Sequence, residues 1–302
     1  MHYGSEKIGS VYLGSEKIAE GWMLDQGVLR RVFEDGKWVR VNTHNTDDAW
    51  YAVIDRMDPY GIKPENASVL PTGVDFTGST DTSAAFYMWE LLTKVRIKGT
   101  STSKRMGEMF FGNRVLTELI GLDTSSLVDA ETMFKGAYAI ETIPPLDLSN
   151  LRNAKHMFSE CSSLKHFSGV WNTPMLEVTE DMFSNCPSLE YPPLMDTSKV
   201  TNAKGMFYNS QQVKVIPAYD LSSATNMEYL LLGAYALTEI NMFGMRYSFS
   251  IENAKLDASE LNALFGRLGA AAGEQNLKIT GNPGAAACNP AIATAKGWTV
   301  ER

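Results

Sequence analysis

The stretches MFSECSSLKHF (residues 157–167) and DTSKVTNAKGMF (residues 196–207) contain the pattern that decides the fold. Outward from them, a Met-Phe pair recurs along the chain and ends in one Leu-Leu copy. The second residues of these pairs follow at intervals of 24, 24, 25, 24 and 24 residues, and they are Phe110, Phe134, Phe158, Phe183, Phe207 and Leu231. A constant period of this length predicts a solenoid of stacked repeats.

Three further columns keep the same period. A short polar residue lies eleven positions before each of these slots, namely Asp123, Asp147, Asn172, Asp196 and Asp220, with Gly99 in the first copy. Two apolar columns follow each pair, one formed by Leu116, Ile140, Leu164, Leu189, Val213 and Leu237, the other by Leu119, Ile143, Phe167, Ile216 and Ile240. A unit of this size cannot bury its own apolar face, whereas stacked units share one core.

The residues between these columns predict the local structure of a repeat. The Leu-x-x-Ile segment alternates like a short strand. The Asp, followed by Thr or Leu and then Ser, predicts a turn in which a side-chain oxygen accepts local N–H groups. The stretch that ends in Met-Phe has a helix-like apolar spacing. We therefore expect an α+β fold with a leucine-rich-repeat solenoid of about six 24-residue units over residues 96–244.

The two stretches quoted above resemble the leucine-rich repeats of BspA-type bacterial surface proteins and mycoplasma lipoproteins. The resemblance covers about half of the chain. It implies a right-handed solenoid used for adhesion, and it does not identify the ligand.

The flanks of the solenoid carry different patterns. The motif GSEKI occurs twice, at residues 4–8 and 14–18, and Asp35-Gly36 lies within Phe33–Val41, so we expect an N-terminal β-hairpin module over residues 1–43. The phrase SVYLGSEKI (residues 10–18) resembles the opening of bacteriophage virion proteins of the tail and fibre type. This resemblance implies that residues 1–43 dock on the virion. Residues 44–95 are expected to form a linker and an N-terminal cap with a helix over residues 82–93.

The C-terminal segment, residues 245–302, is expected to form an α/β cap. Asp257 and Glu260 resemble a capping box and predict a helix, while Leu277 and Trp298 begin short strands. The run ITGNPGAAACNPAIATAKGWTV (residues 279–300) resembles the terminal segment of phage proteins that carry similar repeats.

Composition limits the classes of function. A formal net charge of -8 over 302 residues argues against a nucleic-acid-binding surface. We find no apolar run of 18 residues and no signal peptide, so we expect no membrane insertion. We expect the protein to be made in a cytoplasm and either to stay there or to leave by a route other than the general secretory pathway. The three cysteines argue against a disulfide framework. Cys161 and Cys186 fall in one column on adjacent repeats, where buried thiols are favoured over a disulfide.

The sequence gives little indication of a catalytic site or a metal site. No HExxH, GxSxG, P-loop or GxGxxG motif is present, so we expect no enzyme and no cofactor. His156 and His166 are interpreted as isolated surface histidines. Stacked Asp side chains could bind Ca²⁺, but Asn172 and Gly99 interrupt their charge. Turn formation therefore explains the Asp residues better, and no metal site is expected.

The candidate ligand contacts are outward-facing strand positions. They are Glu118, Thr142, His166, Tyr191, Val215 and Glu239, which should form one column. Trp171 belongs to the single 25-residue repeat. Two interpretations of Trp171 stay open: it is an exposed contact residue, or it fills the space that the extra residue makes.

These observations predict a non-enzymatic bacteriophage virion structural protein, a tail or fibre component. Its N-terminal module would bind other virion proteins, and its repeats would bind a protein or glycan of the host-cell surface. The alternatives are a capsid decoration or head-fibre protein, a bacterial surface adhesin, and an enzyme such as a glycan depolymerase. A homo-oligomer is left open, although no coiled-coil heptads are present.

Overall fold

The computed structural model describes residues 6–13, 16–25, 28–31, 52–53, 73–89, 92–169 and 171–302. Its strands and helices are short. In chain order they are β1 (Glu6–Leu13), β2 (Glu16–Asp25), β3 (Val28–Arg31), β4 (Ala52–Val53), β5 (Gly73–Asp75), β6 (Lys94–Lys98), β7 (Glu118–Ile120), β8 (Thr142–Ile143), β9 (His166–Phe167), β10 (Val215–Ile216), β11 (Glu239–Ile240), β12 (Phe249–Ser250), α1 (Ala258–Arg267), β13 (Gln275–Lys278), α2 (Ala291–Thr294) and β14 (Trp298–Glu301).

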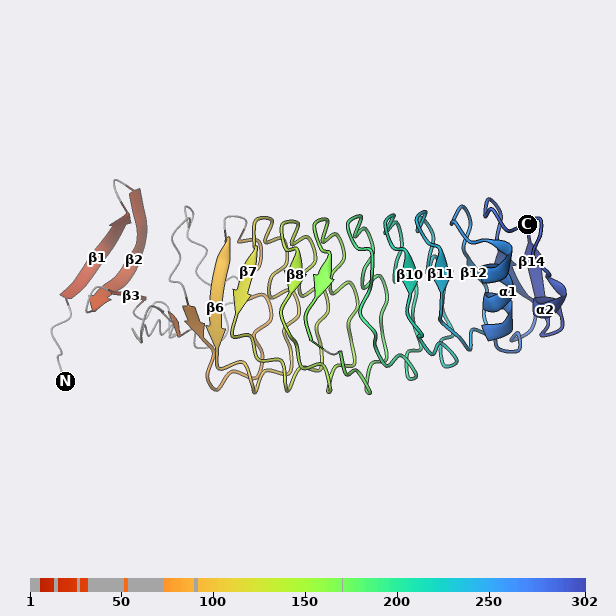
Figure 1. Cartoon of the computed structure of the whole chain (residues 1–302). Helices are drawn as coiled ribbons and strands as arrows, with labels where there is room; N and C mark the ends of the chain where they lie inside the picture. Colours follow the sequence, from red (N-terminus) through yellow and green to blue (C-terminus); the bar gives the residue numbers. More distant parts are fainter. Residues whose placement is uncertain are drawn as a thin grey trace.

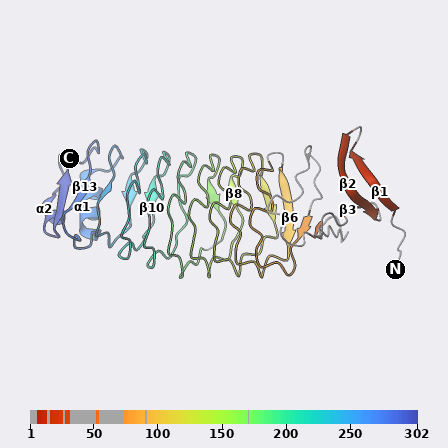
Figure 2. The same cartoon turned by 180° about the vertical axis from the view of Figure 1, so that it is seen from behind.

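Parallel pairing between successive repeats builds the solenoid. In β8 and β9, for example, Thr142 pairs with His166 and Ile143 pairs with Phe167. The chain forms about nine turns, here named rungs, which follow one another along one axis (Figure 1). Figure 2 shows the same stack from behind. The expected repeat solenoid is therefore confirmed, but it is a β-solenoid with few helices and more turns than the six units counted in the sequence.

The segment around each Met-Phe pair is not helical, so the helix-like conformation predicted from its apolar spacing is wrong. In each of these segments two residues four positions apart have left-handed backbone angles, for example His156 at φ 53° and Glu160 at φ 63°. The N–H of Phe158 donates to Met182 in the next rung at 2.9 Å, whereas the N–H of Cys161 donates back to Phe158 at 3.2 Å. The segment is a series of overlapping turns. Because each turn closes over three residues, buried positions recur at intervals of three and four, as they do in a helix.

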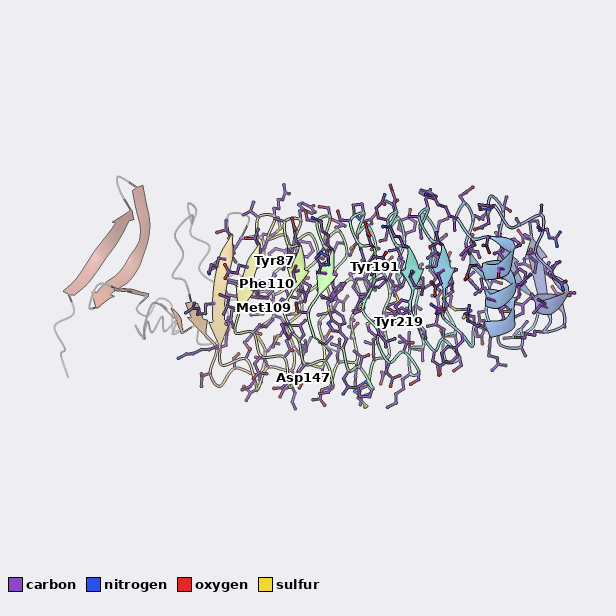
Figure 3. The ribbon with its side chains drawn as sticks, viewed as in Figure 1. Tyr87, Met109, Phe110, Asp147, Tyr191 and Tyr219 are labelled. Carbon is purple, nitrogen blue, oxygen red and sulfur yellow. The ribbon has the colours of Figure 1, made fainter. Side chains whose placement is uncertain are left out.

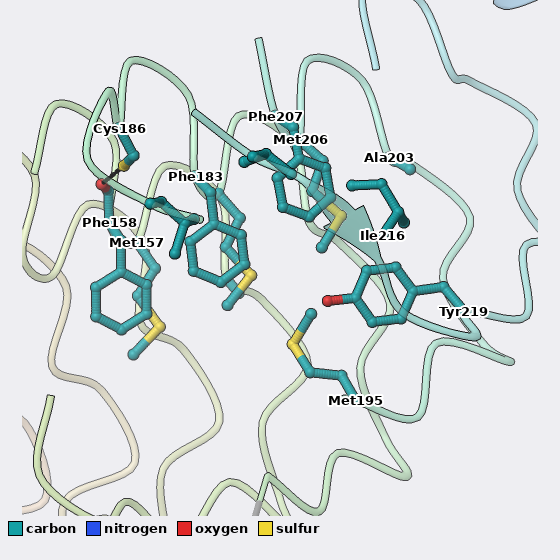
Figure 4. Packing of buried hydrophobic residues seen from close by; sticks show 14 of the residues in the cluster. Met157, Phe158, Phe183, Cys186, Met195, Ala203, Met206, Phe207, Ile216 and Tyr219 are labelled. Atoms are coloured by element: carbon teal, nitrogen blue, oxygen red, sulfur yellow. Dashed lines mark hydrogen bonds between the residues drawn. The ribbon is translucent and has the colours of Figure 1, made fainter. Parts of the chain in front are cut away.

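One aromatic ring per rung forms the centre of the core. The Phe column consists of Phe86, Phe110, Phe134, Phe158, Phe183 and Phe207. Neighbouring ring centroids lie 5.1 to 5.7 Å apart with nearly parallel planes. Tyr219 extends the stack at 6.3 Å from Phe207, and Figure 4 shows its last members in a row. Equivalent positions thus lie over one another, which is the arrangement that the repeat predicted.

The Asp column forms turns, as the sequence analysis preferred. Oδ1 of Asp147 accepts the backbone N–H of Ser149 at 3.0 Å, and Asp123, Asp196 and Asp220 accept the N–H two residues on in the same way. Figure 3 places Asp147 at the lower edge of the stack. A second polar column, which the sequence analysis missed, begins six residues later. There Asn153 accepts the N–H of Lys155 at 3.0 Å.

The N-terminal part of the solenoid begins earlier than predicted. Residues 82–93 were expected to be a helix, but Ala84 and Met88 have the left-handed angles of the later rungs. Phe86 is the first ring of the Phe column. Strands β5 and β6 pair in parallel and β6 pairs with β7, so part of the expected linker and cap belongs to the stack. The repeat was hidden here because Ala85 replaces the Met that precedes later Phe residues.

The two ends contain the remaining elements. Strands β1, β2 and β3 form an antiparallel sheet, as the duplicated motif predicted, while the hairpin expected at residues 33–41 lies outside the described residues. Helix α1 begins after Asp257, whose Oδ1 accepts the N–H of Glu260 at 2.9 Å. Strands β12, β13 and β14 form a parallel sheet that contains Leu277 and Trp298.

Two cysteines on adjacent rungs are part of the core. Cys161 and Cys186 are free and buried, in agreement with the favoured interpretation. Their thiols donate to the backbone carbonyls of Phe134 and Phe158, each at 3.1 Å. Burial raises the pKa of Cys186 to about 12, so the thiol stays protonated and unreactive.

Candidate ligand-binding groove

The predicted outward column lies on the solvent side of the short strands. Four of its members are exposed (Glu118, Thr142, His166 and Tyr191) and two are partly buried (Val215 and Glu239). Strand pairing places Thr142 beside His166, and it places Val215 beside Glu239. In β7, Glu118 forms an ion pair with Lys94 of the preceding rung at 2.8 Å. The predicted residues therefore do lie in a column on the solvent side, although Glu118 is already paired with a lysine.

This column is interrupted between His166 and Tyr191. Strand β9 pairs with β8 and β10 pairs with β11, while the described residues 190–194 form no strand between them. Pro192 and Pro193 follow Tyr191, and a proline has no N–H to donate to a neighbouring strand. This break follows the repeat that is one residue longer than the others, and a second break separates β7 from β8. We name residues 158–183 the irregular repeat.

A groove of about 750 Å³ opens at this break. Its described lining is mostly aromatic and aliphatic, with a few polar side chains, and comprises Lys165, His166, Phe167, Gly169, Trp171, Asn172, Tyr191, Pro193, Leu194, Met195 and Asp196. Figure 3 shows Tyr191 in the rung beyond β9. The groove thus combines the irregular repeat with the strandless segment that follows it.

Trp171 forms the floor of the groove rather than an exposed contact. Its side chain is 3% exposed, so it fills the space made by the extra residue. The indole meets Phe167 edge-on at a centroid distance of 4.9 Å and lies tilted against Phe158 at 5.8 Å. Its Nε1 is buried with no hydrogen-bond partner. An unpaired buried donor is costly, and because protein atoms cover Nε1, it is not exposed to a ligand in the groove.

The opposite wall is held in place from the next rung. Tyr191 and Leu194 are 58% and 64% exposed, the highest values among the large hydrophobic side chains of the described residues. The buried Tyr219 donates its hydroxyl to the carbonyl of Pro193 at 2.6 Å. The Lys214 ammonium lies 5.8 Å from the centre of the Tyr191 ring and binds Glu190 at 2.6 Å. The exposed apolar surface is therefore presented on a fixed backbone.

Polar groups of both signs border the apolar surface. Lys165, which is paired with Glu141 at 3.1 Å, and His166 lie on β9 or just before it. On the other side, Oδ1 of Asp196 accepts the hydroxyl of Ser198 at 2.7 Å and its N–H at 3.0 Å. These hydrogen bonds lower the pKa of Asp196, so this carboxylate is ionised at neutral pH.

The groove brings together three of the seven predicted contact residues, His166, Trp171 and Tyr191. Thr142 lies next to His166, and the other three predicted residues lie on other rungs. Sequence reasoning missed Leu194 and Asp196 as lining residues. The Pro192-Pro193 pair after a 25-residue repeat was the available indication, since both features disrupt strand pairing at one place.

The described helices include none that is both long and apolar enough to cross a membrane. The chain matches the model of a family described as "Mycoplasma protein of unknown function, DUF285" over residues 80–194 and 192–262. The matched residues cover more than half of the chain and both walls of the groove. The match is consistent with a BspA-type repeat protein. No curated protein matches the chain.

Proposed function

The chain belongs to the family described as Mycoplasma protein of unknown function, DUF285, and on that premise we propose that it is a non-enzymatic binding protein whose solenoid attaches to a cell surface. The groove beside the irregular repeat carries this proposal. Ligand sites are concave and mostly apolar, with a few polar groups that fix orientation. The described lining has this composition.

The composition of the groove favours binding over catalysis. Asp196 is the one carboxylate among the described lining residues, and glycan hydrolysis uses two carboxyl groups placed on opposite sides of the scissile bond. Asp196 is also held in its ionised form by Ser198, which does not suit a general acid. The exposed apolar surface and its polar border instead suit a ligand with apolar faces and polar groups, as a surface glycan or protein has.

We place this protein in a bacteriophage virion, as a tail or fibre component. Support comes from the opening and closing segments of the chain, which resemble those of phage virion proteins, and from the β-hairpins at the N-terminus, which would bind other virion proteins. The capsid decoration or head-fibre protein is the alternative within a virion. The bacterial surface adhesin is favoured by a separate observation, since the matching family is described from mycoplasma.

A double substitution in the groove tests the binding role. Tyr191→Ala with Leu194→Ala removes its most exposed apolar surface, and we expect at least a tenfold loss in the binding of the purified chain to intact host cells. Tyr235→Ala is the matched control, because Tyr235 is also exposed, at 48%, but does not line the groove. Equal binding by the double variant and the wild type would refute the proposed site.

The setting of the protein needs a separate experiment. Deletion of residues 1–43 should abolish incorporation into phage particles while the repeats still bind cells, and normal incorporation would refute the docking role. Antibody labelling of particles distinguishes a tail or fibre position from a position on the head. Protein found on intact, uninfected cells would instead support the adhesin.

A further inference from the structure

Two adjacent rungs place an imidazole and two carboxylates together, away from the groove lining. Nδ1 of His156 lies 3.9 Å from Oδ2 of Asp181. One ligand atom each from His156, Glu180 and Asp181 lie within 4.8 Å of one another. His156 and Asp181 occupy the same position in successive repeats and have the same left-handed backbone, at φ 53° and 51°. Their side chains therefore leave the backbone in a similar direction, one rung apart.

The imidazole of His156 is not the isolated surface group expected from the sequence. Its side chain is 25% exposed, and Nδ1 is buried with no hydrogen-bond partner. A buried imidazole nitrogen is ordinarily satisfied, because leaving it unpaired costs free energy. This nitrogen faces the Asp181 carboxylate at a distance too long for a hydrogen bond. A side-chain shift of about 0.5 Å would bring the two atoms to the separation of two ligands of one tetrahedral ion.

The rung after Asp181 carries a glycine at the equivalent position, which leaves space for the Asp181 carboxylate. Gly205 occupies the position equivalent to His156 and Asp181, and a Cβ atom there would lie 2.1 Å from Oδ1 of Asp181. A side chain at this position would displace the carboxylate. Among the described rungs, this position otherwise carries Ala84, Glu108, Thr132 and Tyr229, so the pairing of an imidazole with a carboxylate occurs once in the stack.

Neighbouring polar groups orient Glu180. Its Oε2 accepts the side-chain N–H of Asn202 at 2.8 Å, and its Oε1 lies 3.4 Å from Nζ of Lys155. The other two lysines near the cluster are paired elsewhere: Lys135 with Glu160 at 3.5 Å and Lys204 with Glu228 at 3.3 Å. Hydrogen bonds of this kind around a ligating carboxylate are typical of metal sites.

We propose that His156, Glu180 and Asp181 bind one divalent transition-metal ion, with zinc as the best match. An imidazole nitrogen and carboxylate oxygens are ligands that Zn²⁺ accepts, and three protein ligands leave a fourth position for water or for another molecule. The ion would join His156, which lies just before the irregular repeat, to Glu180 and Asp181 at its end. It would thereby cross-link two successive rungs.

The test uses the full-length chain without an affinity tag, titrated with ZnCl₂ by calorimetry and with Co²⁺ by absorption spectroscopy. We expect one bound equivalent and a higher melting temperature with Zn²⁺, because an ion that binds the folded state stabilises it. His156→Asn and Asp181→Asn should each weaken binding at least tenfold. Asn tolerates the left-handed backbone at both positions, so these variants should keep the fold, which circular dichroism without metal would verify.

His166→Asn is the control for adventitious binding to an exposed histidine, and this variant should still bind one equivalent of Zn²⁺. The groove variant Tyr191→Ala should also retain it, so loss of cell binding and loss of zinc binding are separable. The proposal is overturned if the wild type binds no ion, or if His156→Asn and Asp181→Asn bind Zn²⁺ as the wild type does.

Discussion

The core is packed differently in two neighbouring parts of the solenoid. One is the regular rungs between Phe110 and Phe158, and the other is the irregular repeat between Phe158 and Phe183. In the regular rungs, each ring stacks on the next at 5.1 to 5.3 Å and an Asp turn begins each unit. In the irregular repeat, the stack widens only to 5.7 Å and Trp171 enters the core from the side, while the segment that follows, residues 190–194, forms no strand. Strand pairing is also interrupted in the regular part, between β7 and β8. The Phe column thus accommodates the extra residue with little change in ring spacing.

This difference indicates where a stacked repeat can acquire a binding site. Each regular position contacts its equivalents above and below, so a side chain there is constrained by two neighbours. Where pairing is interrupted, the chain can present exposed side chains such as Tyr191 and Leu194 without losing the core. If the proposed function holds, stability and recognition belong to different rungs, and substitutions in the two regions test this.

The largest expected effect is in the regular part. Phe134→Ala should lower the free energy of unfolding by about 3–5 kcal/mol, because it removes a fully buried ring and leaves a cavity between Phe110 and Phe158. Phe167→Ala, in the irregular repeat, should cost about 2 kcal/mol, since that ring is partly exposed and has edge contacts. Urea unfolding followed by circular dichroism measures both. Equal losses would show that the two regions are equally constrained.

The sequence predicted the stack better than the path of the chain within a rung. Equivalent positions were readable because the Phe and Asp columns keep one period. The overlapping turns could not be predicted, because turns that close over three residues bury side chains at the same intervals as a helix does. Phe86 was overlooked because Ala85 stands in place of a Met. His156 and Asp181 are 25 residues apart, so only the stacking register, including the extra residue, brings them together.

The groove, like the proposed metal site, could be predicted only in part from the sequence. Trp171, His166 and Tyr191 were found from an irregular spacing and from outward strand positions. That they share one groove depends on the loss of pairing at Pro192 and Pro193, which a count of repeats does not reveal.

A smaller effect is expected at Trp171. Trp171→Phe removes part of a buried side chain, but it also removes an N–H that has no partner. The two contributions oppose each other, so the free energy of unfolding should change by about 1 kcal/mol or less, whereas binding to cells through the groove should weaken. Thermal and urea unfolding measure the first quantity, and the cell-binding assay measures the second. A loss of about 3 kcal/mol or more would mean that the indole N–H is satisfied in the free protein.

The smallest effects compare equivalent positions of the Asp column. Asp147→Ala should cost about 1 kcal/mol, because Asp147 accepts the N–H of Ser149. Asn172→Ala, in the irregular repeat, should change stability by about 0.5 kcal/mol or less, since the residue two positions on is Pro174, which has no N–H. Hydrogen bonds from Ser149 also lower the pKa of Asp147. The stabilisation by Asp147 is therefore complete above the carboxyl pKa of the unfolded chain, about 4, and disappears as the pH falls through the lower folded value. Urea unfolding of both variants at neutral and acidic pH should show the Asp147 difference shrinking in acid, while a pH-independent difference would assign the effect to packing instead of to the turn.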